Sequence, residues 1–80
     1  MKIKRRKINI DYIIIPTYYS KPDKSKIKFR KKFYKLYNIL YTPLIVKKVC
    51  NKKYMIKDGY TSYLIAKEFG LEQVEVYIIK

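Results

Sequence analysis

A tight turn at Asp58-Gly59 constrains the fold of this chain more than any other feature of the sequence. An extended segment precedes the turn, and the apolar residues of positions 60–69 recur at helical spacing after it. Gly70 stands where a helix places a left-handed glycine after its last turn. Because a short helix must bury its apolar face, this unit is expected to be the centre of a small α+β domain.

The periods of the apolar residues predict the order β-α-β-β-α-β, on one mixed sheet that two helices cover. Residues 8–15 alternate at period two and are predicted to form the first strand. A short turn is expected to join residues 43–49 and 53–57 into a hairpin, and residues 73–80 to form the last strand. The prediction is therefore an α+β fold in a single domain, residues 1–80.

The first helix is expected from about Ser25 to Leu40, because apolar side chains recur there at spacings of three and four residues. The stripe consists of Phe29, Phe33, Leu36, Tyr37 and Leu40. Ser25 is the expected N-cap. We expect the stripe to be buried and the lysines of the opposite side to face solvent.

The net charge of the chain is +14, from 20 Lys and Arg residues against 6 Asp and Glu residues. Residues 1–57 hold 18 of the basic residues and 2 acidic ones, whereas residues 58–80 hold 2 basic and 4 acidic residues. Such a field attracts nucleic acid, nucleotide phosphates or an acidic protein, although AT-rich codons are an alternative source of part of the lysines. Residues 1–7 are a basic lead-in, either frayed or already part of a strand.

The sequence shows no pattern of a membrane or secreted protein. Its longest apolar runs, such as residues 12–15, are far too short to span a bilayer, and no signal peptide is recognisable. Cys50 is the only cysteine, so an internal disulfide is excluded, and no zinc-binding pattern is present. We expect a cytoplasmic protein with no membrane partner and no metal.

The turn at residues 58–62 is the candidate site for an anion. The first N–H groups of a helix have no partner inside it, and the helix dipole is positive there. Gly59 permits a close approach of the ligand, and Thr61 and Ser62 add hydroxyl donors. The alternative is structural: Asp58 or Thr61 caps the helix, and nothing binds.

The basic side of the first helix is the candidate nucleic-acid surface. Lysines contact phosphates without reading the sequence. Tyr34, Tyr37 and Tyr41 lie among them and could stack on bases. The candidate nucleic-acid-binding residues are Arg5, Arg6, Arg30, Lys31, Lys32 and Lys35. The alternative is a solvated helix face with the tyrosine rings in the core, which we expect for Tyr37, while both roles stay open for Tyr34 and Tyr41.

Three runs of residues resemble the N-terminal domain of ParB proteins and its relative sulfiredoxin. They are Thr-Pro-Leu-Ile-Val at residues 42–46, Tyr-Met-Ile-Lys-Asp-Gly-Tyr at 54–60, and Ala-Lys-Glu-Phe-Gly-Leu at 66–71, followed by Val-Glu-Val at 74–76. The likeness covers residues 8–79 and depends on the combined pattern rather than on one motif. It implies a ParB-like domain of the kind that binds a nucleotide at the glycine turn.

The residues after Gly59 differ from those that the family carries at this turn. In that family two arginines follow the glycine in ParB proteins, and a Cys-His-Arg run follows it in sulfiredoxin. Gly59 matches the glycine, but Tyr60 replaces the cysteine, and residues 61–62 replace the arginines. The resemblance therefore excludes the sulfiredoxin reaction. It leaves phosphate binding by residues 58–62, with Lys26 or Lys28 supplying positive charge. The candidate phosphate-binding residues are Asp58, Gly59, Tyr60, Thr61, Ser62, Lys26 and Lys28.

The leading hypothesis is a non-catalytic ParB-like module that binds nucleic acid or a nucleotide, which the resemblance associates with plasmid or phage systems. One alternative is a ParB-like enzyme that hydrolyses nucleotides or cuts nucleic acid. Metal-assisted cleavage needs clustered carboxylates, and Asp58 has only Asp11 and Asp23 as distant candidates. Another alternative is a protein-interaction domain with an acidic partner.

Overall fold

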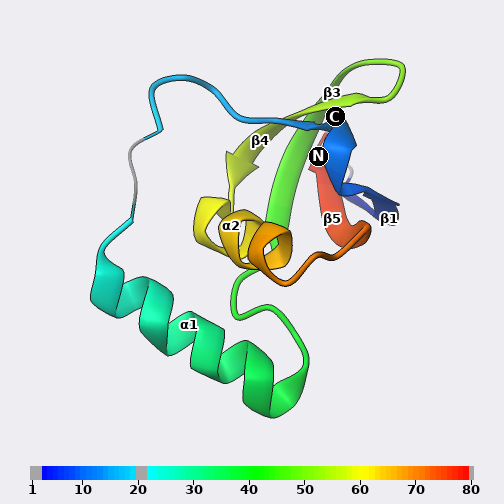
Figure 1. Ribbon diagram of the computed structural model, residues 1–80. Helices are drawn as coiled ribbons and strands as arrows, with labels where there is room; N and C mark the ends of the chain where they lie inside the picture. The colour runs from blue at the N-terminus through cyan, green and yellow to red at the C-terminus, as the bar shows by residue number, and fades with distance from the viewer. Residues whose placement is uncertain (1–2, 20–21, 80) are drawn as a thin grey trace.

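The computed structural model describes residues 3–19 and 22–79, in which five strands form one sheet beside two helices (Figure 1). The elements are β1 (Ile3–Asn9), a 3-10 helix (Ile10–Tyr12), β2 (Ile13–Ile14), α1 (Lys24–Tyr37), β3 (Leu44–Cys50), β4 (Lys53–Asp58), α2 (Tyr60–Glu68) and β5 (Gln73–Ile79). The sheet order is β1-β5-β3-β4-β2, with antiparallel and parallel pairs alternating across it. The predicted α+β class and the mixed sheet are confirmed.

The first strand differs from its prediction, because two short strands and a 3-10 turn replace one strand. β1 begins at Ile3 and pairs antiparallel with β5, so the lead-in is part of the sheet from that residue on, and residues 1–2 lie outside the described part. The side chain of Asn9 accepts a hydrogen bond from the N–H of Asp11 at 2.8 Å, which favours a turn over an extended strand. β2 then pairs with β4, at the other edge of the sheet.

The core is built by alternate residues of the central strands. In β5, Val74, Val76 and Ile78 are buried while Gln73 and Glu75 are exposed, as the period-two pattern predicts. The buried apolar residues of the cluster are Ile8, Ile10, Ile13, Leu44, Val46, Tyr54, Ile56, Ala66, Val74, Val76 and Ile78. α2 contributes its completely buried Ala66, so this helix is the one that packs on the sheet.

The end of α2 follows the prediction for Gly70. This glycine has a φ of +70°, and its N–H donates to the carbonyl of Lys67 at 3.1 Å. The N–H of Leu71 donates to the carbonyl of Ala66 at 3.0 Å, and the Leu71 side chain packs against the core. The two bonds satisfy carbonyls that a helix end would otherwise leave without a partner.

The ends of α1 lie elsewhere than predicted. Asp23 is the N-cap, because its carboxylate accepts the N–H of Ser25 at 3.0 Å, so the prediction of Ser25 as the cap is wrong. Asn38 ends the helix with a φ of +59°, and its N–H donates to the carbonyl of Tyr34 at 2.7 Å. Asparagine adopts this left-handed conformation more readily than other side chains, so the helix stops before Leu40.

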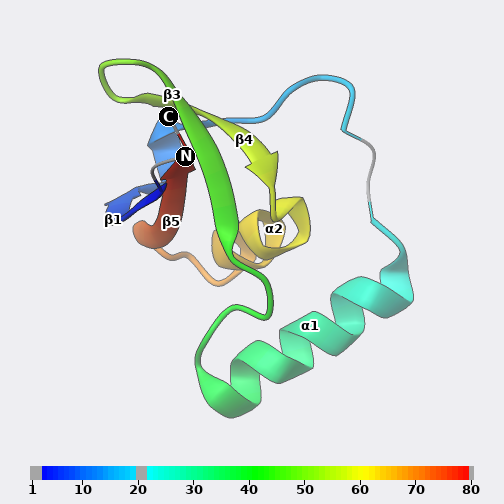
Figure 2. The ribbon, with the colours of Figure 1, turned by 180° about the vertical axis from the view of Figure 1, so that it is seen from behind.

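Most of the predicted apolar stripe of α1 is exposed rather than buried. Phe29 is 56% exposed, Leu36 67% and Tyr37 62%, and no residue of the helix is buried. Figures 1 and 2 show the reason from two sides: α2 lies between the strands and α1, so α1 packs against α2 instead of the sheet. The expectation that this stripe enters the core is therefore wrong for Phe29, Leu36 and Tyr37. Phe33 is partly buried, and Leu40, which lies beyond the end of the helix, packs against the core.

Candidate anion-binding turn and basic helix

Gly59 is held in place by the close approach of another segment. Its φ is +91°, and a Cβ built on it would lie 2.4 Å from the carbonyl oxygen of Pro43 and 3.0 Å from the Cα of Leu44. A glycine is therefore required here by packing and by backbone conformation, whether or not a ligand binds. This closeness joins the start of α2 to the start of β3.

The Asp58 carboxylate lies at the start of α2. It accepts the N–H of Gly59 at 2.9 Å, and no side chain caps the helix itself. The carboxylate is stabilised there by the positive end of the helix dipole. Its negative charge also opposes the approach of a phosphate to the same amides.

Ser62 does not offer its hydroxyl to a ligand in this structure, because Thr42 engages it. The Ser62 side chain is completely buried, and its Oγ donates to the carbonyl oxygen of Thr42 at 2.7 Å. The two hydroxyl oxygens are also 2.8 Å apart. Thr61 is buried as well, with 6% of its surface exposed. The pair Thr42–Ser62 therefore fixes α2 to the segment before β3.

A row of four tyrosines lies beside the turn. The rings of Tyr18 and Tyr19 are 5.3 Å apart, those of Tyr19 and Tyr60 5.2 Å, and those of Tyr60 and Tyr63 6.4 Å. The Tyr19 hydroxyl donates to the carbonyl of Lys57 at 3.0 Å. Partial burial raises the pKa of Tyr19, and the neighbouring Tyr18 and Asp58 raise it further.

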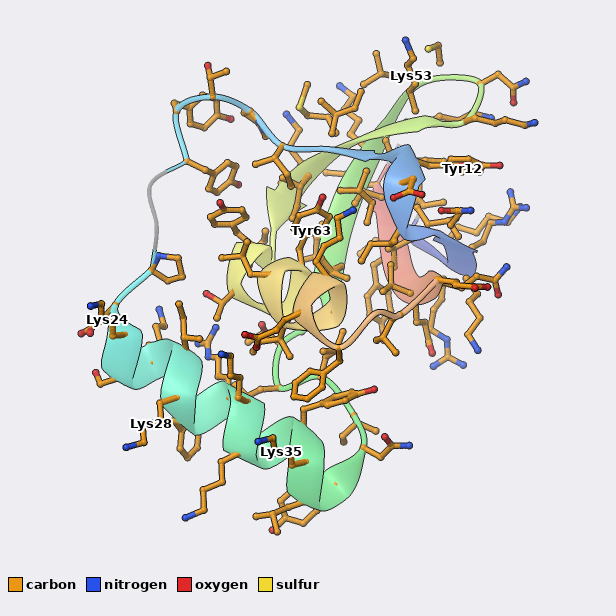
Figure 3. The ribbon with its side chains drawn as sticks, viewed as in Figure 1. Tyr12, Lys24, Lys28, Lys35, Lys53 and Tyr63 are labelled. Carbon is orange, nitrogen blue, oxygen red and sulfur yellow. The ribbon has the colours of Figure 1, made fainter. Side chains whose placement is uncertain are left out.

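The predicted site residues on α1 are not joined to this turn. Lys28 points away from α2 in Figure 3, and Lys26 is exposed on the same helix. Within residues 3–19 and 22–79, neither lysine makes a hydrogen bond or ion pair with the residues of the turn. The structure thus brings Asp58, Gly59, Tyr60, Thr61 and Ser62 together and leaves the two lysines apart from them.

The six predicted nucleic-acid-binding residues lie on two elements. Arg30, Lys31, Lys32 and Lys35 belong to α1, whereas Arg5 and Arg6 belong to β1 at the edge of the sheet, away from α1 in both ribbon views (Figures 1 and 2). Arg6 instead lines a cavity of about 360 Å³ with Lys7, Lys48 and Lys52. These residues therefore do not form one continuous surface.

Two of these cations already have acidic partners. The Nε of Arg5 lies 2.8 Å from Glu75, and the Nζ of Lys31 lies 2.7 Å from Glu68 on α2. Lys32 and Lys35 are exposed and have no ion pair among the described residues. The pairing of Lys31 leaves no signal in the sequence, because Glu68 is distant along the chain.

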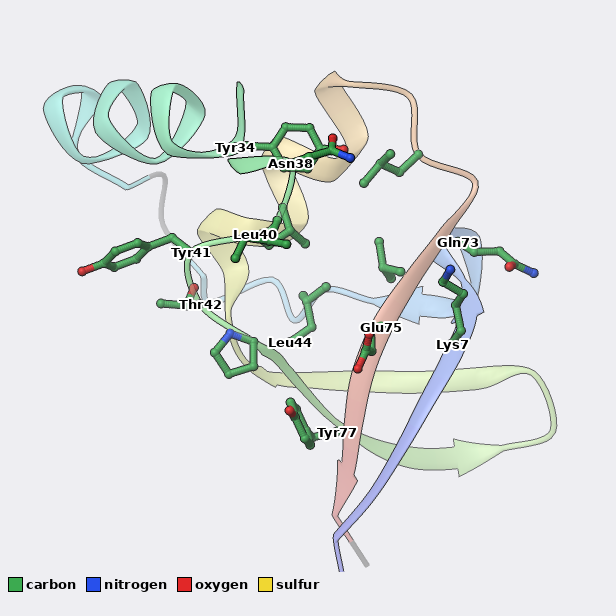
Figure 4. A pocket seen from close by; sticks show the side chains of 14 residues that line it. Lys7, Tyr34, Asn38, Leu40, Tyr41, Thr42, Leu44, Gln73, Glu75 and Tyr77 are labelled. Carbon is green, nitrogen blue, oxygen red and sulfur yellow. The ribbon is translucent and has the colours of Figure 1, made fainter. Parts of the chain in front are cut away.

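A cavity of about 480 Å³ lies beside the segment between α1 and β3 (Figure 4). Its wall includes Tyr34, Thr42 and Tyr77, with Lys7 from β1 and Glu75 from β5. This cavity has no counterpart among the predicted sites, since it forms between segments far apart in the chain. Its mixture of charges gives no preference for an anion.

Two acidic residues that metal-assisted cleavage would require beside Asp58 have other partners. Asp11 pairs with Lys67 at 3.2 Å, and Asp23 caps α1. In the described part of the chain, no group of three or more His, Cys, Asp or Glu side chains is placed to hold a metal ion. No helix among the described residues is long and apolar enough to cross a membrane.

Comparison with known proteins places this fold among solved structures. No family model and no curated protein matches the sequence. Sulfiredoxin from Arabidopsis thaliana superposes with a TM-score of 0.79 at 20% identity, over 96% of this chain and 85% of the other. The C-terminally truncated ParB from Caulobacter crescentus, complexed with CTP-gamma-S, gives 0.75 at 14% identity, over 96% of this chain and 44% of the other.

A free serine kinase in complex with AMP also matches, with a TM-score of 0.78 at 16% identity. The match covers 100% of this chain and 32% of the kinase, so the chain spans less than half the length of both this protein and the ParB chain. At these identities the comparisons show the fold alone. The chain has a ParB/sulfiredoxin-like fold, as the resemblance in its sequence implies.

Proposed function

Starting from the ParB/sulfiredoxin-like fold, we propose that this chain is a non-catalytic module that binds polyanions, with nucleic acid as its main ligand. The observation that carries the proposal is the composition of α1. Seven of its fourteen residues are Lys or Arg, and none is acidic. No residue of the helix is buried, and Lys31 is its only residue in an ion pair within the described chain.

This charge is better suited to phosphates than to reading a base sequence. Lysines bind phosphates as point charges, and each neutralised phosphate releases counterions. We therefore expect binding that tolerates changes of sequence and weakens as salt rises. Arg5 and Arg6 on β1 add to the long-range attraction but lie on a separate surface.

A nucleotide phosphate at the Gly59 turn is the second candidate ligand. Two neighbours with this fold are recorded with nucleotides, one with CTP-gamma-S and one with AMP. In this chain the ligand would meet the first amides of α2 without the arginines of ParB proteins. Because the Asp58 carboxylate already lies there and the Ser62 hydroxyl is engaged, we expect such binding to be weak.

The first experiment measures the affinity for labelled DNA by fluorescence anisotropy over a series of salt concentrations. Lys32→Gln and Lys35→Gln should each lower the slope of log affinity against log salt by about one. Lys53→Gln, an exposed lysine of the β3–β4 hairpin, is the matched control and should leave the slope almost unchanged. Affinity that does not depend on salt would contradict the proposal.

The second experiment tests the turn by calorimetric titration with CTP and with AMP. Asp58→Asn retains an oxygen that can accept the Gly59 N–H but removes the negative charge, so it should strengthen nucleotide binding. Equal binding by the two proteins would locate the nucleotide elsewhere. Phosphate release that Asp58→Ala abolishes would instead support the enzyme alternative.

A further inference from the structure

Four aromatic rings gather where α1 meets the segment that follows it, and we call them the α1 aromatic cluster. They are Phe29, Phe33, Tyr37 and Tyr41. The ring centroids of Phe33 and Tyr37 are 4.7 Å apart, and Tyr41 lies edge-on to Phe33 at 5.1 Å and to Phe29 at 5.5 Å. These contacts fix the rings relative to one another, so they form a preformed surface.

Three rings of the cluster are open to solvent. Phe29 is 56% exposed, Tyr37 62% and Tyr41 48%, while Phe33 is partly buried between them. Exposed apolar side chains that gather in one place usually mark a site of interaction. Single exposed rings elsewhere on a surface need no such explanation.

Cations flank the cluster on the same helix. Lys26 precedes Phe29 by three residues and Lys32 follows it by three, so both are its neighbours on the helix surface. The guanidinium carbon of Arg30 lies 5.2 Å from the centroid of the Tyr41 ring, within the range of a cation–π contact. No acidic residue belongs to the helix, so nothing on α1 repels a phosphate.

We infer that the α1 aromatic cluster stacks on unpaired bases, and that the preferred ligand is single-stranded nucleic acid. The inference depends on the proposed binding of nucleic acid and narrows it to one class. Aromatic rings beside a positively charged path bind single strands without reading sequence, because every base has a face on which a ring can stack. In a duplex those faces are covered by neighbouring bases, so the rings would contribute little.

The same charges disfavour the other occupants of this face. Lysine is depleted from the buried centres of protein interfaces, whereas it is frequent around this cluster. A second copy of the chain would bring two helices with seven cations each and no acidic residue into contact. A polyanion with unpaired bases matches both the charge and the rings.

The test compares a thymidine oligonucleotide with a duplex that has the same number of phosphates, at one low salt concentration. Fluorescence anisotropy gives both affinities for the wild-type chain and for Tyr37→Leu and Phe29→Leu, which keep an apolar side chain without an aromatic face. Each variant should weaken binding of the single strand by roughly tenfold and leave the duplex unchanged. Leu36→Ala, on the same helix, is the control and should change neither affinity.

The outcomes separate this inference from the proposed function. Equal affinity for both ligands, with no effect of the ring variants, would overturn the inference and leave polyanion binding intact. Absence of binding to either ligand at low salt would overturn the proposed function itself. Dimerisation that Tyr37→Leu abolishes, or competition for the cluster by an acidic peptide alone, would assign the face to a protein and also overturn the inference. Circular dichroism of each variant confirms that it is folded.

Discussion

The sheet with α2 and the helix α1 are two regions that differ in how far their side chains are buried. The side chains between the sheet and α2 are apolar and buried, and Leu44, Val46, Ile56 and Val76 are completely buried. α1 has no buried residue, and it meets α2 through an ion pair and through the tilted rings of Tyr34 and Phe69, the C-cap residue of α2. The difference indicates that one region holds the fold together, while the other displays charge and aromatic rings to a ligand.

The largest effect should come from the core. Leu44→Ala removes a completely buried side chain and should lower the free energy of unfolding by about 2–5 kcal/mol. Leu36→Ala on α1, where the side chain is 67% exposed, should change it by less than about 0.5 kcal/mol. Urea denaturation measures both. Equal losses would mean that α1 supports the fold as much as the sheet does.

A somewhat smaller loss is expected at the start of α2. Gly59→Ala adds a Cβ that would lie 2.4 Å from the Pro43 carbonyl oxygen at a φ of +91°, so it should destabilise the chain by about 2–4 kcal/mol. Gly70→Ala has a φ of +70° but nothing within 4 Å of the added carbon, and should lose only about 1 kcal/mol. Equal melting temperatures of the two variants would show that the close approach of Pro43 does not affect stability.

Removal of the Ser62 hydroxyl tests the contact between α2 and the segment that follows α1. Ser62→Ala removes the donor to the Thr42 carbonyl and a partner of its hydroxyl, and should lower stability by about 1–3 kcal/mol. Ser25→Ala, at an exposed position of α1, serves as the control and should have almost no effect. Thermal denaturation is sufficient to separate them, and an unchanged Ser62 variant would show that the pair is not needed.

The smallest effect is expected where the two regions meet. Lys31→Gln breaks the ion pair with Glu68. The Lys31 side chain is 35% exposed and the Glu68 side chain 52%, so the variant should lower the free energy of unfolding by about 0.2–1 kcal/mol at low salt. High salt should abolish the difference, because it screens exposed charges. Lys35→Gln on the same helix should show no loss at either salt concentration. A larger loss for Lys31→Gln would show that α1 is docked more firmly than its exposure suggests.

The parts of the fold that the sequence predicted well depend on neighbours in the chain. The alternation of residues 73–79 and the role of Gly70 require only local periodicity and one backbone conformation, while residue 80 of the predicted strand lies outside the described residues. The turn after Asn9 also depends on a local contact, because the Asn9 side chain accepts the N–H of Asp11. The β-branched residues around this turn nevertheless predict a continuous strand.

The remaining features depend on contacts between distant residues. An amphipathic stripe shows that α1 has an apolar side, but not that α2 already occupies the face of the sheet. Likewise the hydroxyl of Ser62 looked available for a phosphate, because its partner Thr42 lies twenty residues away. The sequence predicts that Gly59 permits the close approach of a ligand, whereas the group that approaches it in the structure is the carbonyl of Pro43.

The pairing of β1 with β5 has a consequence for how this fold can be joined to others. Ile3 lies opposite Ile79, so the two ends of the described chain leave the sheet side by side (Figure 1). A domain whose ends meet in this way can be inserted into a surface loop of another protein, or circularly permuted, without separating any pair of strands. The arrangement of these two strands therefore suits insertion of the fold as a domain within a larger chain.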